Sequence, residues 1–183
     1  MTVAQSTQSQ TATPAPVAHS VPADAIVREI QKLGITHVIT VPDTFQKTLL
    51  AALADLGSPR LLTVCTEDEG IAINAGLYIG GQQPMMVIQN NGLFACLNSL
   101  KAIPMDARVP TLLVIGQFAR DLTKPSRENA LRAVRMVEPT LETWGIPYYR
   151  LEGPEDLGCI AEAYRRCQDE RGPVAVIVGA PTS

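Results

Sequence analysis

The sequence predicts an α/β protein, a three-layer α/β/α sandwich with a mainly parallel sheet of about six strands. Short apolar runs alternate with helical segments along most of the chain, which is the order that builds a parallel sheet through right-handed crossovers. Aliphatic and small residues dominate, and aromatic residues make up only 4% of the sequence, as expected of strands that are buried on both faces. The 183 residues suffice for one domain with a substantial core.

Helical spacing and turn residues delimit the elements of the first half. Apolar residues recur at helical spacing over 23–33 until Gly34, and a buried strand follows over 37–41 and ends at Pro42. A second helix is expected over 45–56, and a second strand over 61–66 leads into a third helix over 67–79. The third strand is expected over 85–89, residues 90–93 as a loop, and the next helix over 94–103.

The second half continues the alternation. The fourth, fifth and sixth strands are expected over 111–116, 148–151 and 174–178, with helices over 129–144 and 154–167 between them. Pro139 must start or kink a turn in its helix, and the polar stretch 121–128 is interpreted as a mobile loop. Residues 1–20, which are rich in Thr, Gln, Ser, Ala and Pro, are expected to form a disordered tail before a single domain over 21–183.

Composition excludes several classes of function. A net charge of −3 and few aromatic residues argue against binding to nucleic acid or to an anionic membrane. No apolar run approaches the roughly 20 residues of a membrane span. The four cysteines are scattered without a C-x-x-C pair, so we expect reduced thiols in a cytoplasmic protein. Phosphate-binding loops and the G-x-S-x-G motif of hydrolases are also missing from the sequence.

The stretch 64–80 carries the candidate chemistry. Glu67, Asp68 and Glu69 follow an apolar run and open a helix that is unusually rich in glycine and alanine. In one interpretation, a ring or another subunit packs closely on this helix. In the other, the carboxylates complement the helix dipole and the small residues fit the helix to the sheet. Residues 42–44, 90–92 and 117–120 also follow strands, so all four segments should gather at the carboxyl edge where open α/β sheets bind ligands.

Together these segments resemble the pyrimidine-binding domain of thiamine-diphosphate-dependent decarboxylases, and the sulfopyruvate and phosphonopyruvate decarboxylases in particular. The resemblance rests on Gly34–Thr44, on the Glu-Asp-Glu-Gly helix start, and on Gln89–Leu93 with Asn98–Leu100 downstream. It covers roughly residues 21–181, and the order and spacing of the motifs are more specific than any one of them.

The resemblance implies a catalytic glutamate at the start of the third helix, which hydrogen-bonds the aminopyrimidine of the cofactor. In the family this glutamate usually lies nine positions before a late glycine, and counting back from Gly76 gives Glu67. Glu69, which directly precedes Gly70, remains the rival. The resemblance also implies that Asn90, Asn91, Gly92 and Leu93 line the cofactor, although Asn and Gly there would equally suit a turn with left-handed residues.

On the substrate side, the resemblance points to Asp43, Thr44, Gln117 and Arg120. Asp43 faces the reacting group or caps the following helix. Gln117-Phe118-Ala119 departs from the family pattern, and Arg120 is the cation retained nearby. Because a sulfonate or phosphonate requires fixed cations, which Arg120 and Lys124 would have to supply, this departure bears directly on the identity of the substrate.

The resemblance further implies that this chain provides half of an active site. Thiamine diphosphate is held through Mg²⁺ by a Gly-Asp-Gly motif and a downstream Asn, and the sequence has no such motif. A beta subunit would bring that domain and the metal, in an α2β2 or larger assembly that decarboxylates a small 2-oxo acid. The alternative is a non-catalytic binding or assembly subunit of the same fold.

Overall fold

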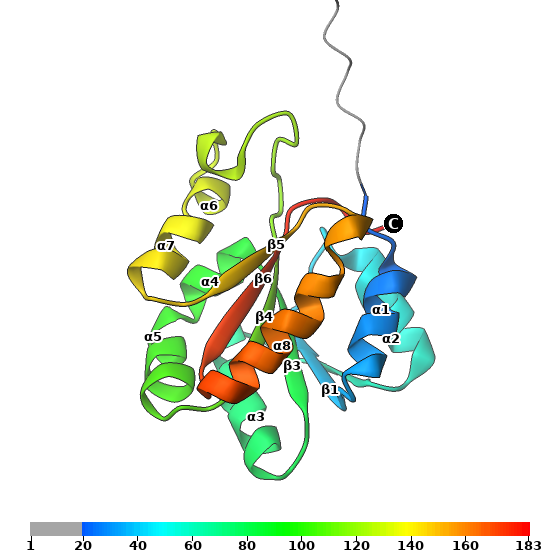
Figure 1. The fold of residues 1–183 in the computed structure, drawn as a ribbon, viewed down its shortest axis with the longest axis vertical. Coiled ribbons are helices and arrows are strands. Elements are labelled where there is room, and N and C mark those ends of the chain that lie inside the picture. Colours follow the sequence, from blue (N-terminus) through cyan, green and yellow to red (C-terminus); the bar gives the residue numbers. More distant parts are fainter. Residues whose placement is uncertain (1–19) are drawn as a thin grey trace, which may run out of the picture.

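Six parallel strands form one sheet in the order β2-β1-β3-β4-β6-β5 (Figure 1). The computed structural model describes residues 20–183, so the predicted tail over 1–20 lies outside the described residues except for Ser20. The strands are β1 (His37–Thr40), β2 (Arg60–Thr63), β3 (Pro84–Gln89), β4 (Thr111–Gly116), β5 (Tyr148–Leu151) and β6 (Pro173–Val178). Every neighbouring pair is parallel, and the predicted fold class is confirmed.

Helices cover both faces of the sheet (Figure 1). On one face lie α1 (Ala23–Lys32), α2 (Lys47–Leu56) and α8 (Gly158–Glu170). On the other lie α3 (Glu67–Ile79), α4 (Asn90–Ala95), α5 (Leu97–Leu100), the π-helical η1 (Lys101–Asp106) and α7 (Val137–Thr143). The short α6 (Arg132–Arg135) and the 3₁₀ turns η2 (Ser126–Glu128) and η3 (Pro154–Asp156) complete the chain.

The central strands place alternate side chains in two separate cores. Leu112 and Val114 of β4 pack toward α1, α2 and α8, whereas Leu113 and Ile115 pack toward the helices of the opposite face. All residues of β4 are buried, which explains the continuous apolar run in the sequence. The sheet is thereby fixed in register, because a slip of one residue would exchange the two cores.

The predicted loop over 90–93 is wrong, because α4 begins at Asn90, directly after β3. Gln89 is still extended, with φ −90° and ψ 161°. Asn90 then turns the chain, and its side-chain Oδ1 accepts the N–H of Asn91 at 3.0 Å. Gly92 does not adopt a positive φ, so the left-handed turn considered for this segment is also absent. Instead, the glycine at position 92 leaves room for a neighbouring side chain.

Two other helices differ from their predicted form. The helix predicted over 129–144 divides at Met136 into α6 and α7, and Pro139 is the third residue of α7, where a helix does not need a backbone N–H. The helix predicted over 94–103 passes through α5 into the π-helical η1, which contains Pro104. A proline interrupts the α-helical hydrogen-bond ladder. The helix widens there to the π form and ends at Asp106.

The two described ends of the chain meet at the carboxyl edge of the sheet. Val21 pairs with Thr182 in an isolated parallel bridge.

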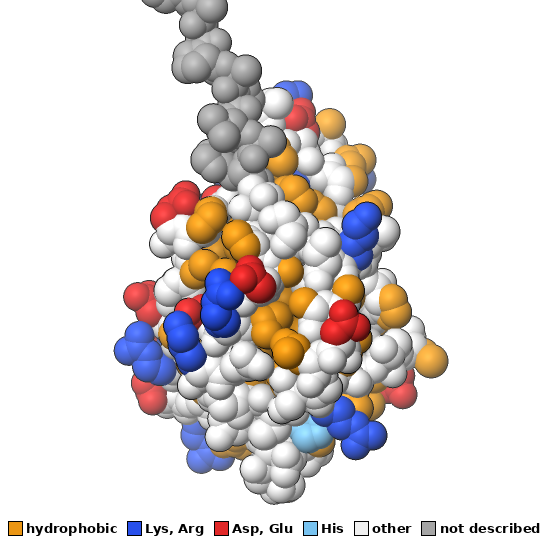
Figure 2. Space-filling model, turned by 90° about the vertical axis from the view of Figure 1, so that its right-hand side faces the viewer, with side chains coloured by type: hydrophobic (Ala, Val, Ile, Leu, Met, Phe, Trp, Pro, Cys, Tyr) orange, Lys and Arg blue, Asp and Glu red, His pale blue; other side chains and the backbone are white. Residues whose placement is uncertain are grey.

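On the face shown in Figure 2, basic and acidic side chains are interspersed among apolar ones. Within residues 20–183, each helix falls short of the length and apolar character that a bilayer span requires.

Candidate functional site

The strand order reverses between β1 and β3, and hydrogen bonds cross this point at the carboxyl edge. From β1 the chain moves outward to β2, then returns to β3 on the other side. Such a reversal is where open α/β sheets form their ligand crevice. Gln89 Nε2 at the end of β3 donates to Asp43 Oδ1 in the loop after β1, at 3.0 Å. The bond ties the loop after β1 to the end of β3.

Asp43 is almost fully buried and fully engaged within the chain, with 4% of its surface exposed. Its Oδ1 also accepts the N–H of Phe45 at 2.9 Å, and its Oδ2 accepts Gln46 Nε2 at 3.2 Å. It does not cap α2, because that helix begins at Lys47 after an N-cap residue without a side-chain cap. Asp43 therefore fixes the conformation of the loop through buried hydrogen bonds. The next residue, Thr44, is exposed.

A buried glutamine joins this loop to the sheet and requires a glycine beside it. Gln46 Nε2 donates to the carbonyl of Ile88 at 3.1 Å as well as to Asp43. A Cβ atom at Gly116 would lie 2.7 Å from Gln46 Nε2 and 2.8 Å from Asp43 Oδ2. The last residue of β4 must lack a side chain for this arrangement to form.

The three carboxylates at the start of α3 have different surroundings. Asp68 is exposed, and a hydrogen bond from the Thr66 hydroxyl holds its pKa below the usual value. Glu69 Oε2 accepts the N–H of Cys65 at 2.9 Å, so it stabilises the turn that enters the helix. Glu67 is half-buried, and among residues 20–183 its carboxylate has no hydrogen-bond or ion-pair partner. Of the three, Glu67 is the partly buried carboxylate, and it is the one without a partner among the described residues.

Glu67 lies directly against α4. A Cβ atom at Gly92 would overlap the Glu67 carboxylate, so glycine at position 92 makes room for this side chain. Burial raises the pKa of the nearby Cys96 to about 12, with a smaller contribution from the negative charge of Glu67. Cys96 is thus a neutral core thiol.

The small residues of α3 divide between the two interpretations offered by the sequence. A Cβ atom at Gly70 would lie 2.7 Å from Met86 Cε and 3.3 Å from Ile39 Cγ2, so Gly70 fits the helix to the sheet. In contrast, Ala72 and Gly76 are exposed, and nothing lies within 4 Å of a Cβ atom built at Gly76. The outer face of α3 is therefore smooth and uncovered.

The predicted cofactor loop is a helical segment with both structural and exposed members. Asn90 is buried, and its Nδ2 donates to the carbonyl of Phe118 at 3.2 Å, which links α4 to the loop after β4. Asn91 is exposed, and its Nδ2 donates to Gln89 Oε1 at 2.8 Å. Leu93 is fully buried in the core. Of these members, Gly92 lies against Glu67, and Asn91 is the one exposed to solvent.

Gln117 and Arg120 belong to a buried polar group that no local motif had indicated. Gln117 is fully buried, and its Nε2 donates to Ser126 Oγ at 2.5 Å. Arg120 Nη1 donates to Gln117 Oε1 at 3.0 Å and to both carboxylate oxygens of Glu152 at 2.8 Å. The Arg120 side chain is only 9% exposed, so its charge is neutralised by Glu152 rather than solvated.

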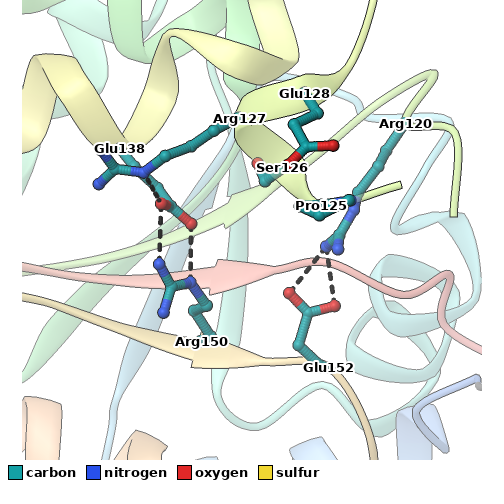
Figure 3. A pocket seen from close by; sticks show the side chains of 8 residues that line it. All are labelled: Arg120, Pro125, Ser126, Arg127, Glu128, Glu138, Arg150 and Glu152. Carbon is teal, nitrogen blue, oxygen red and sulfur yellow. Dashed lines mark hydrogen bonds and ion pairs between the residues drawn. The ribbon is translucent and has the colours of Figure 1, made fainter. Parts of the chain in front are cut away.

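Three arginines and three glutamates surround a cavity of about 360 Å³ between the loop after β4 and the end of β5 (Figure 3). Glu138, on α7, accepts Arg150 Nε and Arg127 Nε at 2.7 Å each. Its side chain is 2% exposed. Hydrogen bonds from Arg150, and next from Arg127, hold the pKa of Glu138 below its usual value against the effect of burial. The three arginines, Glu138 and Glu152 are ion-paired. Sequence reasoning had not identified Glu138, Arg127 or Arg150.

Metal-ligating side chains do not cluster in the part of the chain that the structure describes. The four cysteines, Cys65, Cys96, Cys159 and Cys167, all carry free thiols. His37 lies in β1, and its Nδ1 is 2.9 Å from the Thr36 hydroxyl.

The sequence pattern described as "Thiamine pyrophosphate enzyme, N-terminal TPP binding domain" matches residues 22–138. This span holds β1 to β4, the acidic start of α3 and the helix that follows β3. The chain belongs to the thiamine pyrophosphate enzymes, through their N-terminal TPP-binding domain. The cofactor class expected from the sequence is confirmed at this level.

Within that family, two relatives show which decarboxylases the chain resembles. The chain is 27% identical over 159 residues to sulfopyruvate decarboxylase subunit alpha of Methanococcus maripaludis, covering 86% of this chain and 94% of the relative. It is 31% identical over 106 residues to phosphonopyruvate decarboxylase of Streptomyces viridochromogenes, covering 58% of this chain and 27% of that one. The resemblance to these two decarboxylases is confirmed.

A solved structure supports the fold. Benzoylformate decarboxylase from Polynucleobacter necessarius superposes with a TM-score of 0.68 at 21% identity. The match covers 87% of this chain and 30% of the decarboxylase chain. The match thus spans less than a third of the solved protein and of the phosphonopyruvate decarboxylase, but nearly all of the Methanococcus maripaludis subunit alpha.

Proposed function

We propose that this chain is the alpha subunit of a two-subunit thiamine-diphosphate-dependent 2-oxo acid decarboxylase, similar to the sulfopyruvate and phosphonopyruvate decarboxylases. The observation that carries the proposal is the Glu67 carboxylate, which is half-buried against Gly92 and has no partner among the described residues. A carboxylate kept free at a sheet edge is suited to exchange a proton with a ligand.

The residues present fit the cofactor's pyrimidine ring. Glu67 would hold a proton at a ring nitrogen, while Glu69 keeps its role in the turn through the N–H of Cys65. Asn90, Asn91, Gly92 and Leu93 would line the ring, with Gly92 giving the space and Asn90 and Leu93 fixing the helix. When bound, the cofactor supplies the nucleophilic carbon that adds to the keto carbon and accepts the electron pair released with CO₂.

On the substrate side we place Asp43, Thr44, Gln117 and Arg120. Asp43 and Gln117 are buried, and the charge of Arg120 is neutralised by Glu152, so these three would act as positioning residues through the loops they hold. Thr44 is exposed and able to contact the acid. The overall reaction converts a 2-oxo acid and a proton into an aldehyde and CO₂, and a carboligation with a second carbonyl compound would use the same site.

A beta subunit would complete the site with the diphosphate-binding domain and Mg²⁺. The proposal is supported by a relative that is named a subunit alpha and is matched over 94% of its length. The exposed face of α3 around Ala72 and Gly76 and the segment from Asn90 would then meet the partner. We expect an α2β2 or larger assembly, in the cytoplasm because all four cysteines are free thiols.

Two isosteric variants test the proposal in the complex reconstituted with the beta chain. Glu67→Gln should lower the rate of CO₂ release by about 100-fold or more, because proton transfer by a positioned side chain contributes about that much. Glu69→Gln keeps an oxygen acceptor for the Cys65 N–H and should change the rate by less than about threefold. Bound thiamine diphosphate, measured by mass spectrometry, shows whether each complex is loaded.

The outcomes separate the rival interpretations. A collapse of turnover in Glu69→Gln alone would assign the role to Glu69. Full turnover in both variants would remove the catalytic proposal. It would favour the second candidate, a non-catalytic α/β assembly subunit. Two features support that candidate: the neutralised charge of Arg120 and the unusual segment Gln117-Phe118-Ala119.

A further inference from the structure

A second hollow opens at the carboxyl edge of the sheet, between the loops that follow β1 and β4 and the end of the chain. Its volume is about 420 Å³, within the usual range for a small-molecule site. Its lining includes the apolar residues Phe45, Phe118, Leu122 and Pro181 and the polar residues Thr44 and Lys47. We call it the β1–β4 hollow.

The β1–β4 hollow is linked to the region around Glu67. Phe118, which lines it, accepts the Asn90 Nδ2 hydrogen bond through its carbonyl. Asn90 and Gly92 belong to the same short helix, and Gly92 lies against Glu67. The hollow and Glu67 therefore lie at the same edge of the sheet and are connected through α4.

Large apolar side chains remain uncovered in the β1–β4 hollow. Phe118 is 40% exposed and Leu122 is 42% exposed, although both belong to a loop that is otherwise tied down by polar contacts. Neighbouring exposed apolar groups beside a polar rim are typical of surfaces that a ligand or partner covers. The hollow therefore favours an occupant with an apolar part.

The charges of the β1–β4 hollow add up to one uncompensated cation. Arg120 reaches its wall, but Glu152 neutralises it. Lys124 in the same loop lies 3.5 Å from Asp121. Lys47 has no ion pair with any residue of the described range 20–183. One free ammonium matches one carboxylate, whereas a second anionic group would lie against Phe118 and Leu122 without a counter-charge.

Building on the proposed function, we propose that the β1–β4 hollow selects a 2-oxo acid whose third carbon bears an uncharged, apolar substituent. Lys47 pairs with the carboxylate, and Phe118 and Leu122 contact the substituent. The enzyme would then differ in substrate from its sulfopyruvate and phosphonopyruvate relatives while sharing their reaction.

The test compares two acids on the complex reconstituted with the beta chain. We expect kcat/KM for CO₂ release to be about tenfold or more higher with 4-methyl-2-oxopentanoate than with sulfopyruvate, the discrimination typical of an apolar pocket. Leu122→Lys adds a cation to the hollow and should shift this ratio toward sulfopyruvate by about tenfold. Lys47→Met should raise KM for both acids alike.

Leu56→Lys is the matched control, because Leu56 is 51% exposed at the far end of α2 and does not line the hollow. It should leave the ratio unchanged. A wild-type preference for sulfopyruvate, with both acids decarboxylated, would overturn this inference and leave the proposed function intact. Loss of the complex in Leu122→Lys but not in Leu56→Lys would also overturn it, because the hollow would be a subunit interface.

A complex that binds thiamine diphosphate yet decarboxylates neither of these acids nor pyruvate would refute the proposed function, and this inference with it. Calorimetric titration of the same acids into the complex before cofactor loading gives a reading independent of turnover. Tighter binding of 4-methyl-2-oxopentanoate there would support the inference, and equal binding of both acids would contradict it.

Discussion

Arg120 Nη1 lies 2.8 Å from both carboxylate oxygens of Glu152, so the loop after β4 is fastened to the segment after β5 by a neutralised ion pair. The pair fits only because residue 179, directly after β6, is a glycine, since a Cβ atom there would overlap the Arg120 guanidinium. Arg120 is thus an organising residue of the carboxyl edge, and its charge is not free to attract a distant anion.

Glu152→Gln should destabilise the chain, because it leaves a guanidinium that is 9% exposed without a counter-charge. Since Glu152 itself is 38% exposed, we expect a loss of about 1 kcal/mol in the free energy of unfolding. Urea titration followed by circular dichroism measures the loss. Glu162→Gln, on the exposed side of α8, should change the value by less than about 0.5 kcal/mol, and an equal loss in both variants would contradict the role of the pair.

Glu138→Gln should cost more, because Glu138 is 2% exposed and serves two arginines, Arg127 and Arg150. We expect a loss of about 2 kcal/mol near neutral pH, discounted because both arginines are half-exposed. Glu142→Gln is the matched control, since Glu142 also contacts Arg127 but is 47% exposed. A loss as large in Glu142→Gln would show that burial of the carboxylate is not what matters.

The stabilisation by Glu138 should also depend on pH. Its pKa is lowered in the folded chain from an ordinary value of 4.5, so the ionised form stabilises the fold above that pH. The contribution falls as pH decreases below 4.5 toward the lowered folded-state pKa. The difference in unfolding free energy between wild type and Glu138→Gln should therefore be largest at pH 6 to 7 and shrink by pH 4. A difference that grew on acidification would refute this assignment.

Local patterns predicted most of the fold. The helix over Glu67–Ile79 and the strands over Thr111–Gly116 and Tyr148–Leu151 were predicted with the bounds that the structure has, because period and turn residues agree there. The segment from Asn90 was misjudged as a loop. Asn and Gly are typical of turns, but Gly92 is a glycine because Glu67 occupies the space beside it, a contact that no local pattern reveals.

The polar networks of the site lie beyond such patterns. Glu152 is 32 positions from Arg120, and Glu138 is 12 positions from Arg150, so the place of β5 in the sheet is what brings each pair together. Two acidic residues at such separations carry no sequence signal of their own. The acidic start of α3 was visible in the sequence, but which of its carboxylates is free depends on the hydrogen bond between Cys65 and Glu69.

Gly92→Ala should separate a functional constraint from a structural one. Alanine favours a helix by roughly 0.5–1 kcal/mol over glycine, but here its Cβ would displace the Glu67 carboxylate. We expect an isolated chain of nearly unchanged stability, and a reconstituted complex with about tenfold weaker binding of thiamine diphosphate or slower CO₂ release. Gly158→Ala, at a position with open space, is the control. Wild-type binding and turnover in Gly92→Ala would show that the Glu67 position is not critical.

The exposed face of α3 allows a test of the proposed assembly. A substitution there that stabilises the isolated chain should weaken its association with the partner. Gly76 has open space around it, so Gly76→Ala should stabilise the isolated chain by roughly 0.5–1 kcal/mol. If a partner packs on this face, the added methyl group should nevertheless weaken association, which mass photometry of the mixed subunits measures.

Ala72→Gln extends the test one helical turn away on the same face. Ala54→Gln, on α2, is the matched control. Ala72 and Ala54 are both exposed alanines within helices, and glutamine is a good helix former. Either change should therefore leave the melting temperature of the isolated chain within about 2 °C. Only Ala72→Gln should raise the dissociation constant of the complex, by about tenfold or more. Equal dissociation constants for the two variants would mean that the partner binds elsewhere, and the smooth face of α3 would then need another explanation.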